Sequence, residues 1–184
     1  CSYCYAKRDL KTELKTEEIV HFIEECKKCG VVNLSLTGGD IFANAEWKTI
    51  IATATKNGYE PFLSTKTPLN EDDIKILCDI GIKELQFSLD SIEPRILHQL
   101  IQVNENYFSK VYKTFKYCEQ YGIKLYVRTV LCSINSQLSQ IEEFLSFLKE
   151  FTNIKDWVMT PAFFSEFKQK EYFHLRIKRE ERKN

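Results

Sequence analysis

Two cysteines open the sequence, Cys1 and Cys4 in the stretch "CSYC". A pair of cysteines at this spacing supplies two thiolates to one centre. Three kinds of site use such a pair: a redox dithiol, half of a tetrahedral zinc site, and part of an iron-sulfur site. The pair alone does not distinguish them, so the decision rests on the residues that follow.

The first two kinds of site make different demands on the surrounding sequence. A thioredoxin-like dithiol is expected at the start of a helix, whereas the polar, irregular stretch "YAKRDLKTELK" follows Cys4. For a zinc site, Cys26 and Cys29 provide a second pair of cysteines, and the four thiolates together can form a tetrahedral site. Cys26 also lies on the apolar stripe of a predicted helix, where packing alone explains a cysteine. A zinc-stabilised, non-enzymatic module using Cys1, Cys4, Cys26 and Cys29 therefore stays as the main alternative.

Two further motifs end predicted strands. In "LTGGD", Gly38 and Gly39 precede Asp40, and residues without a side chain let a ligand approach the backbone closely. In "SLDS", Ser88 and Asp90 share one strand face. Each motif also has an ordinary interpretation, because Gly-Gly-Asp fits a turn or a nucleotide-phosphate site and Asp90 could cap the next helix. No lysine-containing phosphate loop accompanies the glycines.

The elements that position these residues alternate between strand and helix. Hydrophobic periodicity and turn residues predict helices over 16–29, 44–57, 70–80, 104–121 and 139–151, and strands over 31–40, 61–66, 83–91, 123–131 and 154–163. Five strands joined by four helical crossovers, right-handed and parallel, build an open or closed α/β barrel.

The strands carry a polar face as well as an apolar one. Leu85 and Phe87 alternate with Gln86 and Ser88. If helices cover the apolar face, the polar face lines the interior, where each unpartnered polar group costs about 1–3 kcal/mol. A polar ligand inside the barrel would relieve that cost. The alternative is a one-faced antiparallel sheet with its polar side in water.

Composition excludes several classes of partner. The 26 basic and 26 acidic residues cancel, and the pI is about 7.0, so no net charge attracts nucleic acid or an anionic membrane. No apolar run approaches the ~20 residues of a membrane span. Seven cysteines, an odd number, do not suit a secreted disulfide framework, which predicts a reducing cytoplasm.

Together, C-x-x-C, Gly-Gly-Asp and Ser-Leu-Asp in this order resemble the radical S-adenosylmethionine (radical SAM) enzymes. The stretch "FLSTKTPLNEDDIKILCDIGIKELQFSLDS" resembles in particular the subgroup that modifies peptides and proteins and carries auxiliary clusters in a SPASM-type extension. The resemblance covers residues 1–161, which we expect to form the core domain. Residues 162–184 are expected to be a basic tail or the start of an extension.

The resemblance implies an iron-sulfur site at the start of the chain. Cys1 and Cys4 match the second and third cysteines of the family motif C-x-x-x-C-x-x-C, with Tyr3 at the usual aromatic position. The first cysteine would lie four residues upstream of Cys1. Because the chain begins at Cys1 and its one methionine is Met159, we expect a truncated, catalytically incompetent core. The expected fold is a partial TIM-like (β/α)6 barrel of parallel strands that lacks its first strand.

The resemblance also implies the cofactors and partners. Three thiolates of the family hold a 4Fe-4S cluster, S-adenosylmethionine binds the open iron, and reductive cleavage gives a 5′-deoxyadenosyl radical that abstracts hydrogen from a substrate. The implied substrate is a peptide or small molecule. The implied electron donor is flavodoxin-like or ferredoxin-like.

By the same resemblance, the backbone of Gly38, Gly39 and Asp40 would hold the methionine amino group, with aspartate where glutamate is commoner. Ser88 and Asp90 would meet the ribose or carboxylate end, and Tyr3 would lie beside the cofactor.

Two residues of "YVRTVLCSIN" complete the candidate cofactor site. Arg128 could pair with the cofactor carboxylate by a charge-assisted bond, and Asn135 is a further candidate. The alternatives are a surface ion pair for Arg128 and a turn for Asn135. Thr65 and Thr67 could line the substrate side, although threonine is common in strands.

Overall fold

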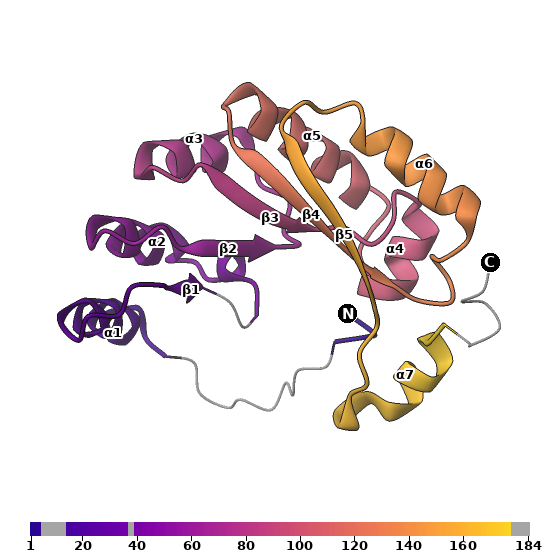
Figure 1. The fold of residues 1–184 in the computed structure, drawn as a ribbon, viewed down its shortest axis with the longest axis horizontal. Coiled ribbons are helices and arrows are strands. Elements are labelled where there is room, and N and C mark those ends of the chain that lie inside the picture. Colours follow the sequence, from indigo (N-terminus) through magenta and orange to yellow (C-terminus); the bar gives the residue numbers. More distant parts are fainter. Residues whose placement is uncertain (5–13, 37–38, 178–184) are drawn as a thin grey trace.

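A computed structural model describes residues 1–4, 14–36 and 39–177 of the chain, and Figure 1 shows its fold. Its strands form one sheet in the order β1-β2-β3-β4-β5, and every neighbouring pair is parallel. The strands are β1 (Ser35–Leu36), β2 (Phe62–Thr65), β3 (Glu84–Ser88), β4 (Lys124–Leu131) and β5 (Ile154–Pro161). This order is that of a barrel wall built strand after strand, and the parallel pairing excludes the antiparallel alternative.

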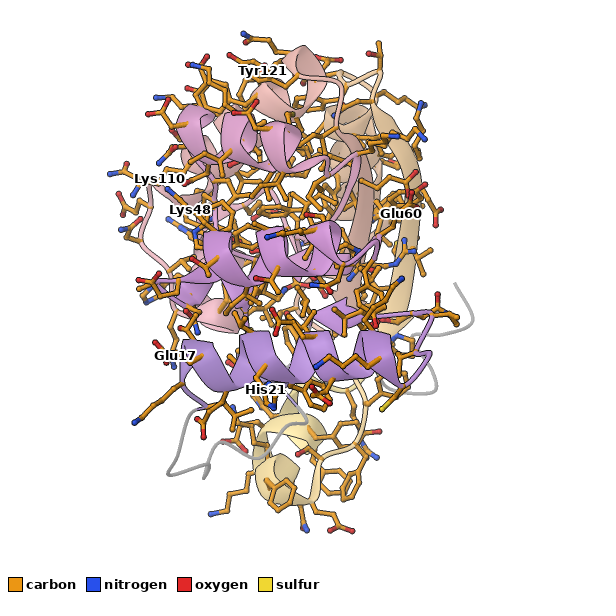
Figure 2. All side chains as sticks on the ribbon, turned by 90° about the vertical axis from the view of Figure 1, so that its left-hand side faces the viewer. Glu17, His21, Lys48, Glu60, Lys110 and Tyr121 are labelled. Carbon is orange, nitrogen blue, oxygen red and sulfur yellow. The ribbon has the colours of Figure 1, made fainter. Side chains whose placement is uncertain are left out.

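Helices connect the strands as expected for parallel crossovers. They are α1 (Thr16–Lys28), α2 (Trp47–Lys56), α3 (Glu71–Ile80), α4 (Pro94–Ile101), α5 (Tyr107–Gln120), α6 (Leu138–Leu148) and α7 (Gln169–Leu175), with short 3-10 helices η1 (Ile41–Ala43) and η2 (Glu166–Lys168). In Figures 1 and 2, α1, α2 and α3 lie side by side along one side of the sheet. The predicted partial parallel α/β barrel is confirmed.

The two faces of the sheet differ as the alternation predicts. Leu85, Phe87 and Val127 are buried against the helices, where the rings of Phe87 and Phe115 meet edge to face at 5.3 Å. The opposite face carries half-buried polar side chains in cross-strand register. The register pairs Ser64 with Gln86, Gln86 with Tyr126, and Ser88 with Arg128.

Local sequence signals fix both ends of α3. Asn70 caps α3 by accepting a hydrogen bond from the Asp73 backbone N–H at 2.9 Å, and Gly81 ends it at φ 96°. The start of α2 differs from the prediction, because η1 intervenes and Asn44 instead accepts a bond from the Glu46 N–H. Strand β1 is also shorter than predicted.

The segment after β5 is partly helical. Leu175 of α7 is buried in a cluster that includes Tyr3, Leu100 and Cys132. The carboxy-terminal segment therefore packs beside the cysteine pair at the other end of the chain. Across residues 1–4, 14–36 and 39–177, no helix combines the length and hydropathy needed to span a bilayer.

Candidate active site

The tetrapeptide of residues 1–4 lies against the end of α4. The backbone N–H of Ser2 donates to the carbonyl of Leu100 at 2.8 Å, and the Ser2 hydroxyl donates to the carbonyl of Gln99 at 3.0 Å. The Cys4 N–H closes a turn on the Cys1 carbonyl at 3.3 Å. Both cysteines are half-buried. They belong to one turn, and the bonds of Ser2 anchor that turn to α4.

Tyr3, between the two cysteines, connects this turn to the end of β3. Its hydroxyl donates to Asp90 Oδ2, which also accepts from Lys66 Nζ at 2.7 Å, while Asp90 Oδ1 accepts from the Val130 N–H at 2.9 Å. Burial first, and the Asp90 charge second, raise the pKa of Tyr3 well above its usual value, so the hydroxyl stays protonated and donates. The Asp90 carboxylate is thus committed to three donors.

Asp40 makes a second network at the end of β2. Its carboxylate accepts from the backbone N–H groups of Phe42 at 3.1 Å, Lys66 at 2.9 Å and Thr67 at 3.0 Å. It also accepts from the hydroxyls of Thr65 at 2.7 Å and Thr67 at 2.9 Å. These bonds tie Asp40 and the turn that begins at this residue to the end of β2, and they occupy both threonine hydroxyls that the sequence assigned to the substrate side.

Lys66 belongs to both networks, and sequence reasoning missed it. Its N–H donates to Asp40, its carbonyl accepts from the Tyr107 hydroxyl at 2.7 Å, and its ammonium pairs with Asp90 and lies 5.5 Å from the centre of the Tyr3 ring. The available signal was a single basic residue between two threonines at a strand end, in "STKT".

The glycine doublet and Ser88 are placed in part. Gly38 lies outside the described residues. Gly39 is exposed, and a Cβ built on it would meet nothing within 4 Å, so a ligand has room to approach its backbone. Ser88 is half-buried on the polar sheet face, in register with Arg128.

Arg128 and Asn135 have partners within the protein. Arg128 Nη1 donates to Asp156 Oδ2 at 3.1 Å. Arg128 also lines a cavity of about 770 Å³, whose walls include Glu60 and Glu84 near the amino-terminal ends of β2 and β3. Figure 2 shows Glu60 on the side opposite Lys48 and Lys110. Arg128 thus forms the ion pair of its alternative interpretation.

The Asn135 side chain holds a turn. Its Nδ2 donates to the carbonyls of Asp90 at 2.7 Å and Val130 at 2.9 Å, and its Oδ1 accepts from the Cys132 N–H at 2.6 Å. With the side chain 4% exposed, this arrangement agrees with the turn interpretation. Asn135 reaches the site through the backbone of Asp90.

A comparison with protein families matches the Radical SAM superfamily over residues 1–148. The chain belongs to the radical SAM superfamily. Among curated relatives, a GTP 3′,8-cyclase of Tolumonas auensis is 29% identical over 157 residues, which cover 82% of this chain and 46% of the relative. The chain therefore spans about half the length of this curated relative.

Solved structures share the fold. Streptococcus suis SuiB bound to S-adenosylmethionine aligns with a TM-score of 0.76 at 17% identity, covering 92% of this chain and 39% of that one. The protein anSMEcpe, with bound AdoMet and Kp18Cys peptide, aligns with a TM-score of 0.65 at 16% identity, covering 89% and 47%. The radical SAM core of this chain thus has the architecture of these two proteins.

The zinc alternative is wrong. Cys26 packs in a separate cluster with Ile23 and Tyr59, and the following Cys29 is exposed at the end of α1. Within the described part of the chain, no three His, Cys, Asp or Glu residues gather in a metal-binding arrangement, so the two cysteine pairs do not meet. Packing explains Cys26 in this radical SAM domain.

Proposed function

We propose that this chain is the core of an enzyme that uses a 4Fe-4S cluster and S-adenosylmethionine to generate a 5′-deoxyadenosyl radical. Cys1 and Cys4, which match the second and third cysteines of the family motif, would supply two thiolates to the cluster. The observation that carries the proposal is the continuous set of bonds from Tyr3, between the cysteines, through Asp90 and Lys66 to Asp40. It joins the cysteine pair, Ser-Leu-Asp and Gly-Gly-Asp, the three motifs that resemble those of the family, at the carboxyl ends of the strands, where barrel chemistry takes place.

The residues fit these cofactors. Thiolates are the ligands of iron-sulfur clusters, and both cysteines are half-buried on one turn. The open space at Gly39 suits an approach of S-adenosylmethionine to the backbone at this residue. When bound, the cluster supplies the electron that cleaves the cofactor.

The protein groups have distinct parts in this proposal. Asp90 holds Tyr3, because its carboxylate is committed to donors within the protein. Ser88 is then the polar group of its motif that contacts the cofactor. The polar sheet face receives the substrate and keeps it away from water. Asn135 acts on the site through Asp90, and Arg128 is paired with Asp156.

We further propose a peptide or protein substrate, because anSMEcpe with its bound peptide shares this fold. A flavodoxin-like or ferredoxin-like protein would supply the electron, in the cytoplasm. Residues 1–161 form the core domain in this proposal, and residues 162–184 continue from it.

The test is anaerobic reconstitution of the complete gene product with iron and sulfide. We expect the absorbance and electron paramagnetic resonance (EPR) of a 4Fe-4S cluster, and 5′-deoxyadenosine by mass spectrometry when dithionite and S-adenosylmethionine are added. Cys4→Ala should abolish both. The matched control Cys29→Ala, at an exposed cysteine, should retain both. A wild-type protein without a cluster, or a cluster that survives Cys4→Ala, would refute the proposal.

A further inference from the structure

We propose that Lys66 is a positioning residue that fixes the cysteine turn and the turn beginning at Asp40 relative to each other, and so sets the affinity for S-adenosylmethionine. This inference rests on the function proposed above and deepens it. The two turns come from distant parts of the sequence, and β2 ends between them. Lys66 follows β2 immediately. Its backbone N–H donates to Asp40, and its ammonium donates to Asp90, which also holds Tyr3.

The main chain of Lys66 is held on both sides. Its N–H donates to Asp40 Oδ2 at 2.9 Å, and its carbonyl accepts from the hydroxyl of Tyr107 at 2.7 Å. Tyr107 is 6% exposed and belongs to α5. The Cα of Lys66 is therefore fixed by an element on each side, which limits where its side chain can reach.

The side chain extends that restraint to the cysteine turn. Its ammonium lies 2.7 Å from Asp90 Oδ2, the same oxygen that accepts from the Tyr3 hydroxyl. The Asp90 side chain is 0% exposed and the Lys66 side chain 25%. A buried carboxylate without a partner of opposite charge is strongly destabilising, and Lys66 is the cation that partners Asp90 while Asp90 holds Tyr3.

Other contacts limit the effect of losing Lys66. Ser2 remains bonded to Leu100 and Gln99, and the Asp40 carboxylate keeps its bonds to Thr65 and Thr67. Each turn therefore stays attached to the barrel on its own. Without Lys66, the two turns lose their fixed position relative to each other. A cofactor that contacts both turns would then bind with lower affinity.

The experiment compares Lys66→Met, Lys66→Arg, Tyr3→Phe and the surface control Lys56→Met in the reconstituted gene product. The Lys66→Met variant should retain its iron. Its dissociation constant for S-adenosylmethionine should rise at least about tenfold, and the EPR shift that this cofactor induces in the reduced cluster should change. Lys66→Arg should recover most of the affinity, because arginine keeps the charge. Lys56→Met should match the wild type.

Coupling between Lys66 and Tyr3 provides the decisive outcome. Because both bind the same oxygen, the double variant Lys66→Met, Tyr3→Phe should lose less affinity than the product of the two single losses. Affinity of Lys66→Met within about twofold of the wild type, or losses that multiply, would overturn the inference.

The proposed function and the inference can fail separately. A wild-type protein that binds neither cluster nor S-adenosylmethionine defeats the proposed function. The inference is then judged on cluster-free protein, where the shifts in urea midpoint caused by Lys66→Met and Tyr3→Phe should be less than additive in the double variant. Additive shifts overturn it.

Discussion

Replacing Asp40 with asparagine tests how firmly the turn that begins at this residue is tied to β2. Oδ1 accepts from the Phe42 N–H, and Oδ2 accepts from the N–H groups of Lys66 and Thr67. Asparagine has nearly the same size, but one of these two positions becomes an amide nitrogen, which cannot accept. In either orientation, at least one backbone N–H then faces another donor.

The magnitude follows from these bonds. Hydrogen bonds to a charged group are worth about 1.5–3 kcal/mol, against about 0.5–1.5 kcal/mol for neutral ones. Asparagine loses at least one of these hydrogen bonds, and the remaining bonds end on a neutral acceptor. We therefore expect Asp40→Asn to lower the free energy of unfolding by about 3 kcal/mol. The assay is urea unfolding of the chain without cluster, followed by the fluorescence of Trp47 and Trp157, with the slope m unchanged.

Asp72→Asn is the matched control. The Asp72 side chain is 86% exposed on α3, and its distance to Lys75 is 3.8 Å. Exposed pairs of this kind contribute little, so its midpoint should equal that of the wild type within error. If Asp40→Asn also leaves the midpoint unchanged, the Asp40 carboxylate does not hold the turn as argued.

Three further outcomes test the surrounding structure. Thr114→Val should cost about 1–3 kcal/mol in urea unfolding, because the buried Leu69 N–H loses the hydroxyl that accepts it at 2.9 Å, whereas Thr114→Ser should cost less. Phe115→Ala, at a fully buried ring, should cost about 3–5 kcal/mol in the same assay. Burial raises the pKa of Cys132 to about 12. Since the thiolate is the reactive form, iodoacetamide at pH 8 should modify exposed Cys29 and spare Cys132, as read by mass spectrometry. Rapid labelling of Cys132 in the native chain would contradict its burial.

Much of the fold was predictable because its signals are local. The alternation of Leu85 and Phe87 with Gln86 and Ser88 identified a strand with one polar face, and Asn70 and Gly81 marked the ends of α3. The start of α2 was not predictable in this way. There η1 uses the Asp40 side chain as its cap, and that carboxylate is placed by partners 25 to 27 residues away.

The candidate site was predictable in its motifs but not in its bonding. The cysteine pair, Gly-Gly-Asp and Ser-Leu-Asp resemble the motifs of the family, and the comparison over residues 1–148 confirms the membership. The sequence assigned Asp90 to a cofactor, whereas the structure shows its carboxylate bound by Tyr3 and Lys66. It assigned Arg128 to the same site, whereas the guanidinium turns toward Asp156.

The sequence by itself determined the alternation of strands and helices and the apolar and polar faces of the sheet. Each depends on residue type at short spacing. Only the tertiary structure decided that Lys66 joins Asp40 to Asp90 and Tyr3, and that Cys26 lies away from Cys1. These facts depend on side chains brought together by strand order, and hydrogen bonds between residues 24 to 87 positions apart leave no periodic pattern in the sequence.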